Sequence, residues 1–316
     1  MKKPVKIVFL DAVTLGVVDN LAAIKSLGDY TGYDYTLMSE RIERISGHNI
    51  VLTNKVVIDR EVMDACPEIE LICVVATGTN IIDLEYAAQK GITVKNVAGY
   101  STESVTQSTF SMLFYLMHSS AYYNDYVKSG DYAQSPIFTN LNREFRELNN
   151  KLFGIIGMGN IGKRVAQVAE AFGARVAYYS TSGKNLTGTG HPHLPLDELL
   201  SKSDVVSIHC PLNSDTKNLL NAERIRRMKP SAYLLNMGRG GIVDEHALAR
   251  AIDENSIAGA ALDVLSSEPI AGDNPLLSVR NKDRLFITPH IAWASSEARQ
   301  LLTERTLENI RSHLEK

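Results

Sequence analysis

Short apolar runs alternate with stretches of helical periodicity along most of the chain. In the first third, the apolar runs read VKIVFL, IVLTN, LICVVAT and ITVKNV. The stretch IDLEYAAQK, between the third and fourth runs, predicts a helix that ends at Gly91, a residue suited to a left-handed stop. This alternation is typical of an α/β protein whose strands run parallel.

A longer apolar segment, from Thr102 to about Ser119, separates this region from a second α/β series. Its apolar positions recur at helical spacing and cover most sides, which predicts a buried helix linking two lobes. The second series offers six strands, LFGIIG, RVAYYS, VVSIHCP, AYLLNM, GAALDV and RLFITPH. Six strands separated by helices predict a doubly wound nucleotide-binding sheet.

The C-terminal segment SSEARQLLTERTLENIRSHLEK predicts an amphipathic helix. Its apolar positions are Leu301, Leu302, Leu307, Ile310 and Leu314. If this helix packs against the first lobe, that lobe is discontinuous in sequence.

The glycine-rich stretch GIIGMGNIGKRV follows the first strand of the second series and precedes a helical pattern. In this context Gly157 permits a sharp turn, Gly159 lets a pyrophosphate approach the backbone, and Gly162 lets helix and strand pack closely. The helix N-terminus would direct N–H groups at the anion. The pattern therefore favours a dinucleotide-binding turn over an ordinary bend between strand and helix.

The end of the next strand departs from the usual nucleotide-binding pattern. Ser180 stands where an Asp or Glu normally accepts hydrogen bonds from the adenosine ribose, and Thr181, Ser182 and Lys184 follow. A carboxylate would repel a ribose 2′-phosphate, whereas hydroxyls and a lysine can bind one. Two readings stay open, a site for NADP and a polar loop that tolerates NAD without strong preference.

Three polar residues, Arg239, Glu268 and His290, come just after strands of the second series. Ligands of open parallel sheets bind beyond the carboxyl ends of the strands, so these residues are expected to converge. An arginine fork can bind a carboxylate, a histidine exchanges protons near neutral pH, and a glutamate can orient its ring. Together they fit hydride transfer to a 2-keto acid, with His290 protonating the oxygen, although each alone also fits a structural role.

Composition excludes several other classes of protein. The chain has 316 residues, 44% of them hydrophobic, which is enough for two domain cores, and its net charge of −3 gives no attraction to nucleic acid or anionic lipid. No segment reaches the ~18 uncharged apolar residues of a membrane span. The spacing of Cys66, Cys73 and Cys210 fits neither a metal site nor a redox motif, which predicts a cytoplasmic protein. His191 and His193 lack a third ligand nearby, so no metal is expected.

The chain resembles the D-isomer-specific 2-hydroxyacid dehydrogenases over essentially its whole length. The resemblance rests on the motifs GIIGMGNIG, HCPLNSDTKNLL, LLNMGRGGIVDEHAL, ALDVLSSEP and ITPHIAWAS. Within that family, VATGTNIID, NVAGYSTESVTQ and TPHIAWAS look most like glycerate dehydrogenases, also called hydroxypyruvate reductases.

The resemblance implies two doubly wound parallel-sheet domains of the Rossmann or flavodoxin-like kind, with a cleft between them that closes on substrate, and a homodimer. A substrate-binding (catalytic) domain would comprise residues 1–98 and 291–316, and a dinucleotide-binding domain residues 99–290.

Site roles also follow from the resemblance. Arg239 would hold the substrate carboxylate, Glu268 would partner the histidine, and His290 would be the acid/base. Trp293 stands near a position where many members have glycine, so it either narrows the substrate pocket or packs in the core. The remaining expected residues are Thr77, Gly78 and Ser101 for substrate, and Thr102, Asn160, Ile161, Pro211, Thr216, Met237, Gly238 and Asp263 for the cofactor, with Ser180, Thr181 and Lys184 at its ribose.

The leading functional hypothesis is reduction of hydroxypyruvate or glyoxylate to D-glycerate or glycolate with NAD(P)H. A second hypothesis keeps the mechanism and changes the substrate to another small 2-keto acid. A third is a nucleotide-sensing regulator on the same scaffold.

Overall fold

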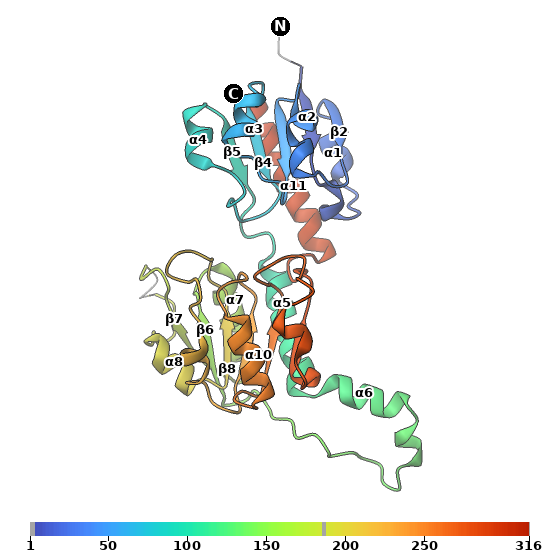
Figure 1. Ribbon diagram of the computed structural model, residues 1–316, viewed down its shortest axis with the longest axis vertical. Helices are drawn as coiled ribbons and strands as arrows, with labels where there is room; N and C mark the ends of the chain where they lie inside the picture. The colour runs from blue at the N-terminus through green and yellow to red at the C-terminus, as the bar shows by residue number, and fades with distance from the viewer. Residues whose placement is uncertain (1–3, 185–187, 316) are drawn as a thin grey trace. The chain divides into compact units, whose positions relative to one another are not determined.

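The apolar runs form two separate parallel sheets, one in each of two units of the chain (Figure 1). The computed structural model describes residues 4–184 and 188–315. Unit 1 comprises Met1–Ser101 and Ala294–Lys316, and unit 2 comprises Thr102–Trp293. The units divide after Ser101 and after Trp293, whereas the sequence analysis expected domain boundaries after residues 98 and 290.

Two contacts explain why unit 2 extends to Trp293. The N–H of Ala292 donates to the carboxylate of Asp263 at 3.0 Å, and the carbonyl of Ala292 accepts from the Ser104 hydroxyl at 2.6 Å. Both partners belong to unit 2, so the segment after His290 is held there.

Unit 1 contains a five-stranded parallel sheet in the order β2-β1-β3-β4-β5. Every residue of β3 and β4 is buried, as expected for central strands covered on both faces. The strands are β1 (Lys6–Phe9), β2 (Asp29–Gly32), β3 (Ile50–Thr53), β4 (Leu71–Val74) and β5 (Thr93–Asn96).

The C-terminal helix α11 (Ser296–Leu314) packs in unit 1 against β4 and α1. The Ser295 side chain caps its N-terminus, and Leu302 and Ile310 are fully buried. The predicted helix before Gly91 is α4 (Leu84–Gln89), and Gly91 has the expected positive φ of 73°. The other helices of this unit are η1 (Ala12–Leu15), α1 (Leu21–Lys25), η2 (Met38–Glu40), α2 (Arg41–Ile45) and α3 (Arg60–Ala65).

Unit 2 contains a six-stranded parallel sheet in the order β11-β10-β9-β8-β6-β7. The chain runs from β6 outward to β7 and then returns to β8 on the other side of β6, so the strand order reverses there. Reversal points of this kind are where open α/β sheets bind ligands. The strands are β6 (Leu152–Ile156), β7 (Arg175–Tyr179), β8 (Val205–Ile208), β9 (Tyr233–Asn236), β10 (Gly259–Leu262) and β11 (Leu285–Ile287).

The predicted buried helix is α5 (Thr102–Met117), and it lies wholly within unit 2 rather than between the units. It packs against α7 and the strands β9, β10 and β11, because its apolar side chains fill the same core cluster. The other helices of unit 2 are α6 (Ser120–Lys128), η3 (Asp131–Gln134), α7 (Asn160–Ala171), α8 (Leu196–Lys202), α9 (Ala222–Ile225), α10 (Glu245–Asp253), η4 (Pro275–Ser278) and η5 (Lys282–Arg284).

Residues 120–147, called the arm below, extend away from the sheet of unit 2 (Figure 1). No residue of α6 is buried, and several large apolar side chains of the arm are exposed. Tyr123 closes the base of the arm, since its hydroxyl donates to the Arg143 carbonyl at 2.8 Å. The exposed apolar side chains are Val127, Tyr132, Ile137, Phe138, Leu141 and Phe145.

Within residues 4–184 and 188–315, no helix combines the length and the apolar character needed to cross a membrane. No group of three or more His, Cys, Asp or Glu side chains in the same ranges could hold a metal ion.

Candidate active site

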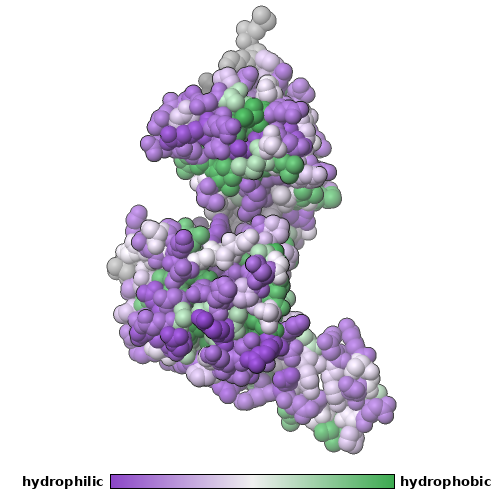
Figure 2. All heavy atoms as spheres, viewed as in Figure 1, coloured by the Kyte–Doolittle hydropathy of each residue, from purple (hydrophilic) through white to green (hydrophobic). Residues whose placement is uncertain are grey.

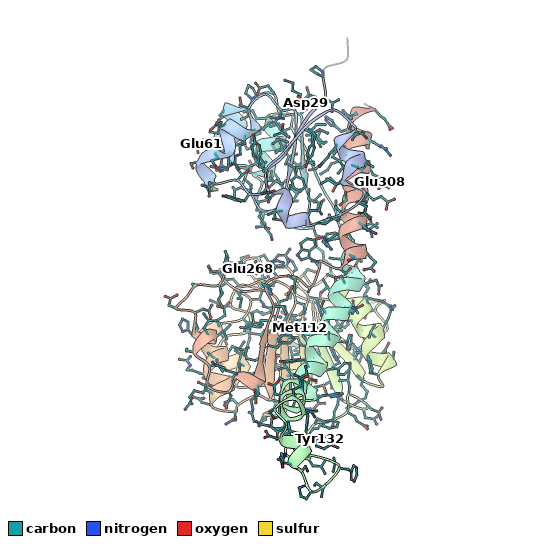
Figure 3. The ribbon with its side chains drawn as sticks, turned by 90° about the vertical axis from the view of Figure 1, so that its right-hand side faces the viewer. Asp29, Glu61, Met112, Tyr132, Glu268 and Glu308 are labelled. Carbon is teal, nitrogen blue, oxygen red and sulfur yellow. The ribbon has the colours of Figure 1, made fainter. Side chains whose placement is uncertain are left out.

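The carboxyl edge of the unit 2 sheet carries the three residues expected to perform chemistry. Arg239, Glu268 and His290 follow β9, β10 and β11, which are neighbours in the sheet. Nδ1 of His290 lies 2.7 Å from Oε2 of Glu268. Figure 3 shows Glu268 at the end of unit 2 opposite Tyr132 of the arm. The structure therefore brings the predicted histidine and glutamate together.

The Glu268 carboxylate is fixed at both oxygens. Oε1 accepts the N–H of Leu265 at 3.0 Å, while Oε2 contacts the His290 ring. Nε2 of His290 makes no hydrogen bond with any residue in the described part of the chain. With Nδ1 bound to the carboxylate, Nε2 is the atom that can exchange a proton with a substrate.

Arg239 lies on the same edge of the sheet and makes a contact of its own. Its Nη1 donates to the carbonyl of Gly238 at 2.7 Å, and the Asn236 side chain donates to the Arg239 carbonyl at 2.9 Å. These contacts fix the loop after β9. The guanidinium retains further N–H donors that can bind a carboxylate.

Asp263, expected near the nicotinamide, is 3% exposed, and its carboxylate is engaged by the turn that carries His290. It accepts the Thr288 hydroxyl at 2.7 Å and the N–H groups of Ile291 and Ala292 at 2.8 and 3.0 Å. This role was not predictable from local patterns, because Asp263 and the turn are separated along the chain and meet only in the folded sheet.

The glycine turn has the geometry that a pyrophosphate needs. Gly157 has a φ of 97°, and a Cβ there would lie 2.8 Å from the Cys210 N atom. A Cβ on Gly162 would lie 2.2 Å from the Gly157 carbonyl oxygen, whereas one on Gly159 would meet nothing within 4 Å. No side chain caps α7, so its first N–H groups face the open space at Gly159. This cradle fits a dinucleotide, with Asn160 and Ile161 in the first turn of the helix.

The segment after β7 is partly enclosed. Ser180 is buried, Thr181 is partly buried and Lys184 is exposed, with the Lys184 N–H 3.3 Å from the Ser182 hydroxyl. The polar groups at this strand end are hydroxyls and one ammonium. These groups are compatible with both NAD and NADP, the two cofactors that the sequence analysis left open.

Other expected cofactor residues support the loops around the turn. Thr216 is fully buried, and its hydroxyl donates to the Pro211 carbonyl at 2.7 Å. Met237 packs in the core cluster beneath α5, and a Cβ on Gly238 would lie 2.7 Å from the Cys210 carbonyl oxygen. Thr102 begins α5, where its carbonyl accepts the Thr106 hydroxyl. Thr216 and Met237 are thus buried beneath the loops around the glycine turn and support these loops by packing and hydrogen bonding.

In unit 1, the loop after β4 is fixed by side chains and leaves two N–H groups available. The Thr77 hydroxyl donates to the Val97 carbonyl at 3.0 Å, and the Asn96 amide donates to the Thr77 carbonyl at 2.6 Å. Among the described residues, no acceptor is bound by the N–H groups of Thr77 and Gly78. Ser101, in the segment after β5, is buried.

The sequence did not point to Asp11, which fixes the loop after the neighbouring strand β3. Asp11 is 4% exposed, and its carboxylate accepts the N–H groups of Asn54 at 2.9 Å and Lys55 at 2.6 Å. Burial raises the pKa of Asp11, and these backbone hydrogen bonds oppose the rise.

The neighbouring His209 and Cys210 are not a reactive pair. Burial lowers the pKa of His209 to about 3 and raises the pKa of Cys210 to about 12. His209 bonds the Ser207 hydroxyl at 2.8 Å. Both groups are therefore neutral near neutral pH, and the thiol is a poor nucleophile.

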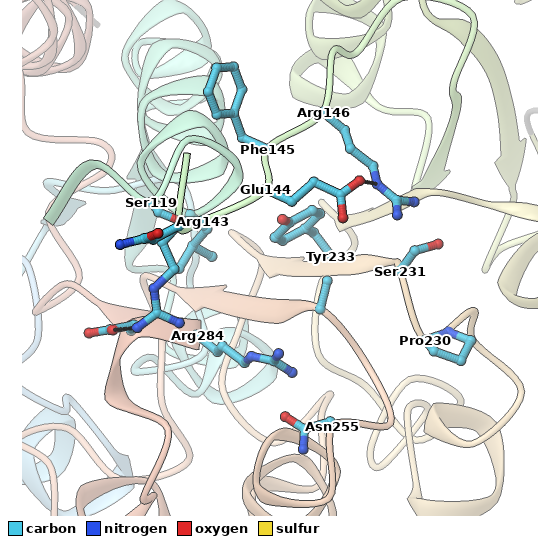
Figure 4. Close-up of a pocket in the computed structure, with 14 residues that line it drawn as sticks. Ser119, Arg143, Glu144, Phe145, Arg146, Pro230, Ser231, Tyr233, Asn255 and Arg284 are labelled. Carbon is cyan, nitrogen blue, oxygen red and sulfur yellow. Dashed lines mark hydrogen bonds and ion pairs between the residues drawn. The ribbon is translucent and has the colours of Figure 1, made fainter. Parts of the chain in front are cut away.

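A cavity of about 430 Å³ lies at the opposite edge of the unit 2 sheet (Figure 4). Tyr233 and Arg284, at the starts of β9 and β11, line it together with Asn255 and with Arg143 and Arg146 of the arm. It contains none of the expected site residues, so the candidate active site is not this cavity.

Comparison with known proteins identifies the scaffold. Residues 110–292, more than half of the chain, match the family described as D-isomer specific 2-hydroxyacid dehydrogenase, NAD binding domain. The chain belongs to this family. The match covers the glycine turn and all three residues after β9, β10 and β11.

Relatives of this family member align along nearly their whole length. The hydroxypyruvate reductase of Blautia hydrogenotrophica is 39% identical, with 98% of this chain and 97% of that relative covered. The glycerate dehydrogenase of Methylorubrum extorquens is 35% identical, with 96% and 95% covered. The D-lactate dehydrogenase of Aquifex aeolicus, solved with NAD and lactic acid, has a TM-score of 0.84 at 30% identity, with 98% of this chain and 95% of that chain covered.

These findings confirm the predicted family and the predicted fold class of two parallel-sheet α/β domains. As a D-isomer specific 2-hydroxyacid dehydrogenase, the chain is an oxidoreductase that uses a nicotinamide cofactor on small hydroxyacids, and unit 2 contains the NAD-binding domain.

Proposed function

We propose that the chain reduces hydroxypyruvate or glyoxylate to D-glycerate or glycolate. The observation that carries the proposal is the His290–Glu268 pair at 2.7 Å, on the sheet edge that also carries Arg239. The hydroxypyruvate reductase and glycerate dehydrogenase described above, at 39% and 35% identity, support this choice of substrate.

In the proposed reaction, the Arg239 guanidinium holds the substrate carboxylate. The nicotinamide, when bound, supplies hydride to the carbonyl carbon. The substrate oxygen takes a proton from Nε2 of His290 and becomes a hydroxyl. Glu268 holds the His290 ring in place while the ring loses its proton. The reverse reaction uses the same groups, with His290 as the base.

The proposed cofactor range includes NADPH as well as NADH. The residues after β7 carry no carboxylate, and Lys184 is exposed among hydroxyl groups. A 2′-phosphate therefore meets no like charge at Ser180.

The exposed apolar side chains of the arm support a homodimer. Phe138 is 87% exposed and Leu141 is 80% exposed. Figure 2 shows hydrophobic atoms at the far end of the arm. Apolar side chains gathered on one projecting segment are characteristic of an interaction surface. We assign this surface to a second copy of the chain, with the arm of each copy packed on the other.

We also propose a cytoplasmic location and no nucleic-acid partner. The three cysteines are free and buried, which suits a reducing compartment. The net charge of −3 offers no electrostatic attraction to phosphate backbones.

The proposed function is tested by initial rates of NADH and NADPH oxidation by the purified chain. The expected result is fast turnover with hydroxypyruvate or glyoxylate, and slower turnover with pyruvate and phosphohydroxypyruvate. A preference for another 2-keto acid would replace the substrate and keep the mechanism. Nucleotide binding without turnover of any keto acid would overturn the proposal in favour of a nucleotide sensor.

A further inference from the structure

Trp293, the only tryptophan of the chain, makes a directed contact with the turn that carries His290. Its indole Nε1 donates to the carbonyl oxygen of His290 at 2.9 Å. The Trp293 side chain is half-buried and packs against the core cluster that contains Met237 and Ala292. An indole N–H that leaves water needs an acceptor, and here that acceptor is the backbone carbonyl of His290.

His290 has a backbone conformation that needs support. Its φ is 54°, in the left-handed region that residues other than glycine rarely adopt. Such conformations persist where the surrounding structure holds them firmly, and they concentrate at functional sites.

Asp263 holds the N–H side of this turn. The His290 N–H donates to the Asp263 carbonyl at 2.8 Å, and the N–H groups of Ile291 and Ala292 donate to the Asp263 carboxylate at 2.8 and 3.0 Å.

The carbonyl side of the turn is held by other residues. The Ala292 carbonyl accepts the Ser104 hydroxyl at 2.6 Å and the Ser108 hydroxyl at 3.3 Å, both from α5. The His290 carbonyl accepts the indole N–H of Trp293 at 2.9 Å. Trp293 is therefore the side chain that fixes the peptide plane directly after the left-handed residue.

The orientation of that peptide plane is coupled to the position of the histidine ring. Rotation of the plane moves the backbone on which the ring is mounted, while Glu268 is anchored separately through Leu265. A small rotation would thus separate Nδ1 from Oε2, which lie 2.7 Å apart, and turn Nε2 away from the substrate oxygen.

We propose that Trp293 is a positioning residue for the acid/base His290, acting through the hydrogen bond from its indole N–H to the His290 carbonyl. The inference rests on the proposed function, since it assigns His290 the proton transfer. A positioning residue differs from a residue that lines the substrate pocket, whose substitution would change the KM of the keto acid. It also differs from a packing residue, whose substitution would change stability alone.

The test is Trp293→Phe, which keeps an aromatic ring and removes the donor. We expect kcat for hydroxypyruvate reduction to fall about 10- to 100-fold, because small misplacement of a catalytic group costs about this much. KM and nucleotide affinity should stay near the wild-type values, and the pH profile of kcat should shift. Trp293→His, which retains a ring N–H, should recover part of the loss. If Trp293→Phe does not fold, the same measurements on Trp293→His and wild type test the proposal. The expected result is then a smaller loss of kcat with an unchanged KM.

Tyr115→Phe is the matched control. It also removes a polar group from a half-buried aromatic side chain of the same core cluster, where Tyr115 stacks on Phe286 at 4.3 Å. Within the described residues, Tyr115 makes no hydrogen bond or ring contact with the turn that carries His290, so kcat of Tyr115→Phe should equal that of the wild type.

The decisive experiment combines Trp293→Phe with His290→Gln in one protein. If Trp293 acts only through His290, Trp293→Phe costs nothing further in the His290→Gln background. An equal loss in both backgrounds, or a changed KM with unchanged kcat, would overturn the positioning role. Near-normal turnover by His290→Gln alone would instead overturn the proposed mechanism, so the two failures are distinguishable.

Discussion

At the scale of single residues, two carboxylates position different parts of His290. Glu268 contacts the ring at 2.7 Å, and Asp263 binds the backbone of the same turn at 2.8 Å and 3.0 Å. Glu268 thus fixes the orientation of the imidazole ring, and Asp263 fixes the backbone that carries it.

The choice of nucleotide is also a residue-scale property, and Ser180 is the position to change. Ser180→Asp should lower kcat/KM for NADPH at least about 10-fold relative to NADH, because a carboxylate beside the 2′-phosphate costs several kcal/mol of repulsion. Parallel initial rates with the two nucleotides measure the ratio. Ser180→Asn, which has nearly the same shape without the charge, should leave the ratio unchanged. An unaltered ratio in Ser180→Asp would place the 2′-hydroxyl elsewhere.

At the scale of elements, the strands present their functional loops at one edge and are tied together at the other. Asp204, just before β8, links three strands at the opposite edge. Its carboxylate accepts the Leu152 N–H at 2.9 Å and the Lys229 ammonium at 2.9 Å, and its carbonyl accepts the Tyr233 N–H at 3.0 Å. These bonds join the starts of β6, β8 and β9.

Asp204→Asn should therefore destabilise unit 2 by about 1–2 kcal/mol near pH 7, because it weakens two hydrogen bonds to a charged acceptor. Burial alone would raise the pKa of Asp204, but Lys229 and the Leu152 N–H outweigh it and hold that pKa below 3.8. The stabilisation is thus fully present above pH 3.8 and is lost as the pH falls through the lower folded-state pKa.

Urea unfolding of wild type and Asp204→Asn at several pH values checks this expectation. The difference between them should shrink toward the acid end. Asp197→Asn is the control, because its ion pairs to Arg224 and Arg227 are 3.7 Å long and half-exposed, so it should have little effect at any pH. A constant difference for Asp204→Asn at every pH would contradict the ionic account.

At the scale of the whole molecule, each unit has its own parallel sheet and core, and within unit 2 the arm projects away from the sheet. The cavity at the base of the arm contains Arg284, whose guanidinium makes no hydrogen bond or ion pair with any residue in the described part of the chain. Figure 4 shows its guanidinium between Tyr233 and Asn255.

Phe138→Asp should convert the proposed homodimer into a monomer, because a buried unpaired charge at the interface is costly. Sedimentation velocity of both proteins at equal concentration measures the change. Leu84→Asp introduces the same charge at an exposed position of unit 1 and should leave the dimer intact. A wild-type chain that sediments as a monomer would contradict the proposed dimer directly.

Much of this arrangement was predictable from local patterns. The six strands of unit 2 and the glycine turn were foreseen because apolar runs, turn glycines and helix periodicity are properties of neighbouring residues. The proximity of Glu268 and His290 was foreseeable from their places after adjacent strands. The contacts of Asp263 with the turn and of Trp293 with His290 were not, because they depend on backbone orientation set by tertiary packing. The arm was missed as an element because α6 is polar on most sides and buries no residue.

The most direct test of the account is single-turnover reduction of hydroxypyruvate by His290→Gln with NADH already bound. The account predicts unchanged NADH affinity and a rate lower by about 10²- to 10⁴-fold, because glutamine cannot deliver the proton that the substrate oxygen requires. A rate close to that of the wild type would show that another group, or water, supplies the proton, and the assignment of His290 as the acid would be wrong.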